Sequence, residues 1–293
     1  MRTVQWSFCC IFLLALSGCQ SLGHQQLPQT PKQKVLSYQG AVAPFRQPIA
    51  LRYHQVPPFQ YVYRQKVLFG ATEKDLSLSG QGVIQKAPVG LHVELAVNHL
   101  TVGKDQLSSD PGSPLVRCLE LIDQIGSVKQ FSLDTAPLEQ RGWHIPDQGT
   151  AQFQEFSYPF KQMIITLPRQ DITMGSLIGG WHNGEQPFLN LAGRILPQGP
   201  ITRNTLQAQA TGITTLNGRK QLVVLISGEY RRQQRKDFVD LHMNGYSLIG
   251  IDSGLATVSV LQVHINVFKD GKHLPGYEAT IHRSITFKGS RQQ

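Results

Sequence analysis

An alternation of apolar and polar residues runs through most of this chain beyond residue 51, and it limits the fold more than any other feature. In residues 91–102 (LHVELAVNHLTV) the apolar residues Leu91, Val93, Leu95 and Val97 stand at every second position, and residues 277–289 (YEATIHRSITFKG) show the same period. Successive side chains of a β-strand point to opposite faces, whereas an α-helix repeats its apolar positions every three or four residues. The pattern therefore predicts half-buried antiparallel strands. The continuous apolar run Leu222 to Ile226 predicts a strand that is covered on both faces.

Turn-forming dipeptides separate several of these runs. We expect two-residue hairpins at three pairs: Asn217-Gly218, Asn244-Gly245 and Asp270-Gly271. In residues 256–268 the apolar positions change parity between Val260 and Leu261, which predicts a β-bulge or a bend there.

The segment 113–126 (SPLVRCLELIDQIG) fits two structures. Ser113 as a cap, Pro114 in the first turn and Gly126 as a stop favour a helix. Leu115, Leu119 and Leu121, however, also fit the alternation of a strand. The sequence leaves the choice open.

These patterns together predict a mainly β protein of antiparallel sheets, sandwich-like or half-barrel-like, with few helices. Two stretches follow the same order of strand, turn, strand, polar insert and further β-like run, which indicates two similar β halves. Alternating patterns also resemble one another by chance. We expect the first half at residues 49–135, an aromatic, turn-rich connecting region at 136–185 and the second half at 186–293.

The first 18 residues have the pattern of an export signal. Arg2 precedes a largely apolar stretch, and the small residues Ser17 and Gly18 follow it. A secretory signal has this order of charge, apolar run and small residues. The run is shorter than the roughly 20 apolar residues that span a bilayer. We therefore predict a signal peptide at residues 1–18.

The order Leu16-Ser17-Gly18-Cys19 resembles the lipobox of bacterial lipoproteins. This resemblance implies that Cys19 is lipidated and becomes the acylated first residue of the mature chain. Gln20 stands where members retained at the inner membrane commonly carry Asp, which implies an outer-membrane location facing the periplasm. The alternative is an ordinary secretory signal followed by an incidental cysteine. Residues 19–48, rich in Gln and Pro, are expected to form the lipidated N-terminus and a flexible tether.

The remaining cysteine and the net charge limit the disulfides that the chain can form and the partners that it is expected to bind. Cys9 and Cys10 leave with the signal and Cys19 takes the lipid, so Cys118 has no disulfide partner within one mature chain. We predict that Cys118 is a small buried residue. The formal net charge of +9 falls by one to +8 when Arg2 is removed, and such a balance favours anionic surfaces. We expect no nucleic-acid partner for an exported, anchored chain.

Histidine patterns give weak support for a metal site. Neither of two candidate groups has the ligand spacing of a known metal motif. His92 and His99 also face opposite sides of a strand unless a bulge intervenes. The two groups are His92, Glu94 and His99, and His242, His264 and His282. We therefore predict no metal ligand and no cofactor.

Catalytic patterns are equally weak. Ser253, in the sequence GIDSGL, fits a β-turn with Gly254 at positive φ better than it fits a nucleophile. The sequence has no Gly-x-Ser-x-Gly elbow, phosphate-binding glycine loop or paired-carboxylate motif. We predict no catalytic residue and a non-enzymatic protein.

The densest charge lies in EYRRQQRKD, where Arg231, Arg232, Arg235 and Lys236 fall within six positions between two expected strands. Such a run is either a solvated hairpin tip or a contact for phosphate groups of lipid or lipopolysaccharide, or for an acidic partner. We expect a lipid-anchored binding module for a lipid or other apolar ligand, or a partner in an envelope assembly. The alternative is a periplasmic hydrolase with a site assembled from scattered His, Ser and Asp residues.

Overall fold

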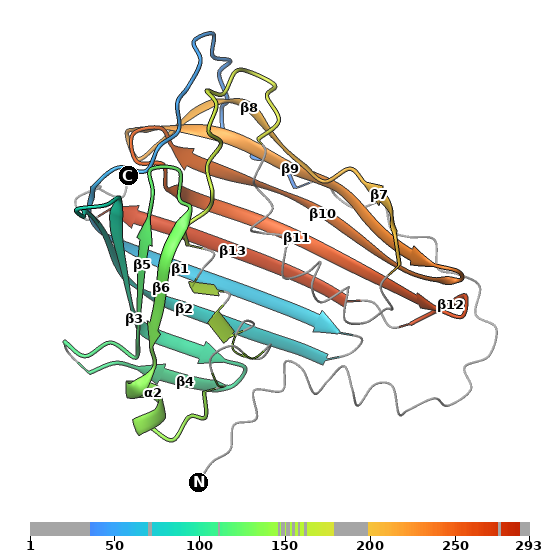
Figure 1. The fold of residues 1–293 in the computed structure, drawn as a ribbon, viewed down its shortest axis with the longest axis horizontal. Coiled ribbons are helices and arrows are strands. Elements are labelled where there is room, and N and C mark those ends of the chain that lie inside the picture. Colours follow the sequence, from blue (N-terminus) through green and yellow to red (C-terminus); the bar gives the residue numbers. More distant parts are fainter. Residues whose placement is uncertain are drawn as a thin grey trace.

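The computed structural model describes residues 36–287, except 70–71, 111, 146, 148–149, 151–152, 154–155, 158, 161–162, 179–198 and 275–276. Its strands form one antiparallel sheet that curves strongly at one end (Figure 1). The first half supplies β1 (Val56–Phe69), β2 (Thr72–Lys86), β3 (Leu91–Val102), β4 (Asp105–Ser108), β5 (Val116–Ile122) and β6 (Val128–Asp134). The second half supplies β7 (Ile201–Asn204), β8 (Gln207–Leu216), β9 (Arg219–Gln234), β10 (Asp237–Gly250), β11 (Ala256–Lys269), β12 (Lys272–His273) and β13 (Tyr277–Phe287).

The two halves meet in the middle of the sheet. The strand order is β6-β5-β3-β2-β1-β13-β11-β10-β9-β7, with β4 on β3, β8 on β9 and β12 on β11. The first and last strands of the described chain, β1 and β13, pair from Phe59 with Phe287 to Phe69 with Tyr277. Each half is thus a run of consecutive antiparallel strands, and the junction makes them one sheet.

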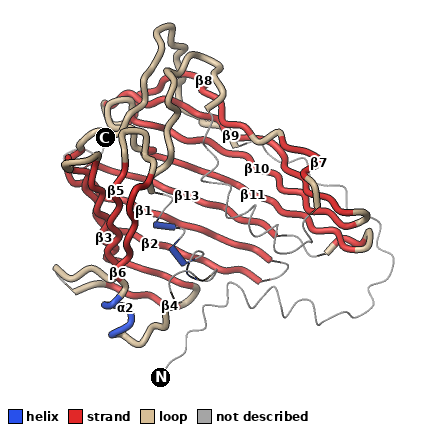
Figure 2. The backbone as a smooth tube through the Cα atoms, in the orientation of Figure 1, coloured by secondary structure: helices blue, strands red, loops and turns tan. Residues whose placement is uncertain are grey.

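Strands dominate the described residues, and helix is scarce (Figure 2). The prediction of a mainly β fold is confirmed. A short helix, α2 (Ala136–Gln140), follows β6. No helix in the described part of the chain is long and apolar enough to cross a membrane.

The undecided segment 113–126 contains strand β5, so the strand interpretation is correct. Its side-chain parity differs from the expected one, because Cys118 and Glu120 are buried while Leu119 and Leu121 are half-buried. Pairing with β3 sets this parity: Cys118 lies opposite the buried Leu95, and Glu120 opposite the buried Val93.

Two of the three predicted hairpin turns are confirmed. Asn217-Gly218 and Asp270-Gly271 both have positive φ and join neighbouring strands. The third prediction, at Asn244-Gly245, is wrong, because both residues lie inside β10. A Cβ on Gly245 would lie 2.1 Å from the carbonyl oxygen of Val260. This glycine therefore allows the backbone of β11 to lie close to β10, and it does not form a turn.

The predicted bulge between Val260 and Leu261 is also wrong. β11 pairs with β13 in unbroken register through both residues. The irregularity lies three residues earlier, where Leu248 of β10 faces Val258 and Ile249 faces Ala256. The extra residue is Thr257, whose hydroxyl donates to Gln221 and is also within reach of the Leu248 carbonyl.

One face of the sheet, here called the inner face, carries the core. Its side chains come from both halves and include Tyr63, Leu78, Leu95, Leu241 and Val263, each 1% exposed or less. The connecting region joins the same apolar core through Trp143, Phe156, Phe160, Met163, Ile164 and Ile165. The described part of this region consists of short helical pieces and irregular backbone. The described fold is therefore a curved sheet packed against a connecting segment.

Residues 36–48, assigned above to the flexible tether, are docked on the opposite, outer face. The backbone N–H of Leu36 donates to Oδ1 of Asn244 at 3.1 Å. Ala43 forms a bridge with Ile213 of β8, with both N–H···O distances 2.8 Å. A tether that runs to residue 48 is therefore contradicted for this stretch, because its backbone is held by β8 and β10.

Candidate functional site

The basic run 231–236 lies at the end of the β9–β10 hairpin. Arg235 and Lys236 form the turn between the paired residues Gln234 and Asp237, and both are exposed. Arg235 has φ 56, and its carbonyl accepts a hydrogen bond from the Gln233 side chain at 3.1 Å. The hairpin prediction is confirmed. The four cations do not share one surface, however, because neighbouring strand residues point to opposite faces.

Arg231 points to the outer face and is already paired. Its Nε and Nη2 donate to the two carboxylate oxygens of Asp240, at 2.5 and 2.7 Å. The guanidinium also lies 4.8 Å from the ring centroid of Phe238. The hydrogen bond to Asp240 raises the pKa of Arg231 further, so its charge is permanent and locally balanced.

Arg232 points to the inner face beside apolar side chains, and the residue as a whole is half-buried. It pairs with Val239 in β10, and Val239 pairs with Val267 in β11; both valines are 3% exposed or less. The Nε atom of Arg232 is buried, and no group among the described residues accepts its hydrogen bond. Buried polar atoms in native proteins almost always have a partner. Arg232 is therefore a cationic donor directed toward the core with one unused N–H.

The apolar surface next to Arg232 extends along three strands. In the described structure it consists of the inner-face residues Tyr230, Val239, Leu241, Met243, Ile265 and Val267, each 5% exposed or less. A guanidinium at the end of such a strip suits a molecule with an apolar chain and a carboxylate or phosphate head.

A second polar group lies buried on the inner face of the first half. The hydroxyl of Tyr61 is buried with no hydrogen-bond partner among the described residues. Burial raises the pKa of Tyr61, and the nearby Cys118 raises it further. The thiol of Cys118 lies 3.9 Å from Oε1 of the buried Glu120. Cys118 is buried as predicted. No pattern in the sequence indicated its polar neighbours.

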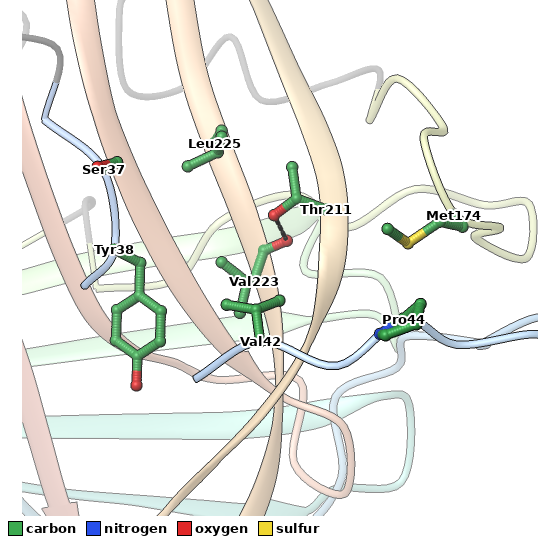
Figure 3. A pocket seen from close by; sticks show the side chains of 8 residues that line it. All are labelled: Ser37, Tyr38, Val42, Pro44, Met174, Thr211, Val223 and Leu225. Carbon is green, nitrogen blue, oxygen red and sulfur yellow. Dashed lines mark hydrogen bonds between the residues drawn. The ribbon is translucent and has the colours of Figure 1, made fainter. Parts of the chain in front are cut away.

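A small pocket lies on the outer face, between residues 37–44 and strands β8 and β9 (Figure 3). Its volume is about 300 Å³, and its lining is mainly apolar: Ser37, Tyr38, Val42, Pro44, Met174, Thr211, Val223 and Leu225. The hydroxyl of Thr211 donates to the Val223 carbonyl at 3.2 Å, so the main polar group there is already used. The pocket offers apolar contact without a charge.

Ser253 lies in a turn, as predicted. Gly254 has φ 73, and its N–H donates to the Gly250 carbonyl at 2.8 Å. Ser253 is 1% exposed, and its Oγ accepts from the Leu255 N–H at 3.3 Å. His54 approaches through its backbone N–H, which donates to the Ser253 carbonyl at 3.3 Å.

The histidine groups do not assemble a metal site within the described residues. A bulge at Asn98 brings His99 to the same face as His92, but His99 contacts Ser108, with Nδ1 and Oγ 3.1 Å apart. His242 and His264 are cross-strand neighbours, and His242 lies 3.5 Å from Glu229. His282 pairs with Val260, which lies four positions from His264 along β11. Cys19, the predicted lipidation site, lies outside the described residues.

Comparison with known proteins adds little to this geometry. No protein-family model matches the chain, and no curated protein matches it. A DUF1329 family protein from Desulfovibrio piger is similar among solved structures, with 6% sequence identity and a TM-score of 0.23. The match covers 79% of this chain and 86% of that chain. A likeness of this size assigns no function.

Proposed function

We propose that this protein is a lipid-anchored envelope protein that binds a molecule with an apolar chain and an anionic head group. The anchor is the acylated Cys19 implied by the lipobox, and the binding surface is the inner face of the curved sheet. The proposed location is the outer membrane, with the protein facing the periplasm. The protein carries or holds its ligand and does not transform it.

The observation that carries this proposal is the buried Nε of Arg232 at the end of an apolar strip. A guanidinium is charged at every physiological pH, so it cannot escape the cost of burial by losing a proton. A carboxylate or phosphate oxygen from a ligand would satisfy the unused N–H and neutralise the charge. An apolar chain attached to that oxygen would lie along the strip.

Entry of the chain requires movement of part of the cover, because the strip is buried in the described structure. The connecting region belongs to the same apolar core and is irregular apart from short helical pieces in its described residues. Segments with few regular hydrogen bonds are the ones that open at low free-energy cost. The sheet beneath, with its continuous ladders, would stay in place.

The hydrolase alternative places its chemistry at residues such as Ser253. That side chain is buried in a turn and hydrogen-bonded to the backbone of Leu255. The binding proposal needs no accessible nucleophile. It draws on Arg232 alone for its polar contact.

Binding of dodecanoate and of its uncharged analogue dodecanol tests the proposal. Wild-type protein should bind dodecanoate about tenfold more tightly, the effect of one charge-assisted hydrogen bond. Arg232→Met should remove that preference and leave dodecanol binding unchanged. Lys220→Met is the matched control, because Lys220 is an exposed cation on the same strand. Calorimetry would measure both affinities.

Two results would overturn the proposal. One is a wild-type protein that binds neither ligand. The other is an Arg232→Met protein that keeps the full preference for dodecanoate, or a Lys220→Met protein that loses it.

A further inference from the structure

Two hairpin ends lie side by side at the end of the sheet away from β5 and β6 (Figure 1). One is the β9–β10 turn at Arg235-Lys236, and the other is the β11–β12 turn at Asp270-Gly271. The N–H of Asp270 donates to Oδ1 of Asp237 at 2.6 Å, which ties the two ends together. We call residues 231–240 and 268–273 the twin tip.

The twin tip is basic. Six cations face three carboxylates within it, which gives a formal charge of +3 with His273 neutral. Arg231 is balanced by Asp240. Four exposed cations lie on or beside the turns: Arg235, Lys236, Lys269 and Lys272. The second hairpin thus doubles the number of exposed cations that the sequence run 231–236 supplies.

Aromatic rings lie beside these cations on the outer face. Phe238 and Phe268 are opposite each other in the β10–β11 ladder, and their rings are stacked with centroids 4.1 Å apart and planes at 15°. The ring of His273 lies 4.8 Å from that of Phe268. Both phenylalanines are only partly buried. Basic side chains around partly exposed rings match the headgroup region of a bilayer, which is anionic outside and apolar beneath.

We propose that the twin tip is a docking surface for an anionic lipid bilayer. Its lysines and arginines would contact lipid phosphate groups, and Phe238 and Phe268 would lie at the boundary with the acyl chains. Docking would hold the long axis of the sheet toward the membrane and place Arg232 near the lipid surface. The inference rests on the proposed membrane location, but not on a ligand bound at the inner face.

The length of the N-terminal segment allows this orientation. Leu36 is fixed at Asn244, and the chain from Cys19 to Leu36 spans 17 residues, roughly 50 Å when extended. From Asn244 to Lys236 is eight strand residues, roughly 26 Å. An anchor at Cys19 therefore reaches the same bilayer that the tip would contact.

Sedimentation with lipid vesicles tests the inference without the anchor. Residues 20–293 are used, because every core residue of the described structure lies between Leu51 and Ile285. We expect binding to vesicles of equal phosphatidylglycerol and phosphatidylcholine, and little binding to pure phosphatidylcholine. Binding should fall sharply at about 1 M salt, where the screening length is about 3 Å.

Charge variants locate the surface. Replacing Arg235, Lys236, Lys269 and Lys272 by Gln should weaken vesicle binding by about fivefold for each cation that lies against lipid. The matched control replaces four exposed cations elsewhere by Gln: Arg46, Lys86, Lys104 and Arg169. The double variant Lys269→Gln with Lys272→Gln gives a milder test, and circular dichroism checks that each variant folds.

Three outcomes would overturn the inference. They are equal wild-type binding to both kinds of vesicle, no wild-type binding to either, and an equal loss in the tip variant and the control. Failure of the dodecanoate test would leave this result standing, so the two proposals fail separately. Loss of vesicle binding in the tip variant alone supports the docking surface.

Discussion

The hydroxyl of Tyr53 forms a two-way hydrogen bond with the backbone of Ile165. It donates to the Ile165 carbonyl and accepts from the Ile165 N–H, both at 3.0 Å, in a fully buried setting. The contact joins the segment before β1 to the interior of the connecting region, 112 residues later. It fixes this part of the connecting region against the core.

Tyr53 and Tyr61 should respond in opposite ways to loss of their hydroxyls. Tyr53→Phe leaves two backbone groups of Ile165 unsatisfied, so we expect a loss of about 2 kcal/mol in the free energy of unfolding. Tyr61→Phe removes a buried hydroxyl without a described partner and should stabilise the protein, by about 1 kcal/mol. Urea denaturation of both variants measures the difference. Equal destabilisation by the two changes would contradict the described environment of Tyr61.

The pair Arg231 and Asp240 should be coupled. Because their side chains are 37% and 14% exposed, we expect Arg231→Met to cost only about 1 kcal/mol of unfolding free energy. Asp240→Leu should cost a similar amount, and the double variant should recover part of both losses. A double-mutant cycle by chemical denaturation gives the coupling. Strictly additive losses would show that the pair contributes nothing.

Asp123 should make the stability of the β5–β6 turn depend on pH. Partial burial alone would raise its pKa, but hydrogen bonds from the backbone N–H groups of Ser127 and Ile125, at 2.8 and 3.1 Å, outweigh it and lower the pKa below 3.8. A depressed carboxyl pKa stabilises the folded state above the unfolded-state pKa and stops doing so as pH falls through the folded-state value.

We therefore expect Asp123→Asn to reduce the free energy of unfolding at neutral pH, with the gap closing as the pH falls below about 4. Asp134→Asn serves as a comparison, because Asp134 accepts only one described backbone hydrogen bond, from Ala136. Denaturation midpoints of the three proteins across pH would show the effect. A gap that grows toward acid would reverse the sign of this prediction.

Cys19→Ser should abolish the proposed acyl anchor. The wild-type protein should stay with membranes in high salt, because two or more acyl chains give stable attachment that screening does not weaken. The variant should be released by salt, since only the charged twin tip would remain to hold it. Membrane fractionation and mass spectrometry of the N-terminal peptide check this. Salt-resistant attachment of the variant would contradict the lipobox interpretation.

Alternation predicted the strands well because it is a local property of a half-buried sheet. It failed where a neighbouring strand decides the outcome. Gly245 appeared as a turn residue, yet its role is to admit the backbone of Val260, which lies 15 residues further along the chain. Likewise the parity of β5 follows from the partner residues in β3, which a pattern within β5 cannot report.

The basic run was correctly placed at a hairpin tip, but its four cations were treated as one cluster. The same period of two that predicted the strand also separates Arg231 from Arg232, so this division was available from the sequence. The pairing of Arg231 with Asp240 and the contribution of Lys269 and Lys272 depend on strand register. No pattern in the sequence predicted that Tyr61 and Glu120 are buried, because nothing local distinguishes a buried polar residue from an exposed one.

Because β1 pairs with β13, the sheet is completed late in folding. Phe59 and Phe287 are paired although 228 residues separate them in sequence, so this contact has a high entropic cost of closure. A chain delivered N-terminus first would keep β1 unpaired on that side until its last strand arrived. Shortening the C-terminus would remove a strand from the centre of the sheet and divide it into two half-sheets with two new open edges.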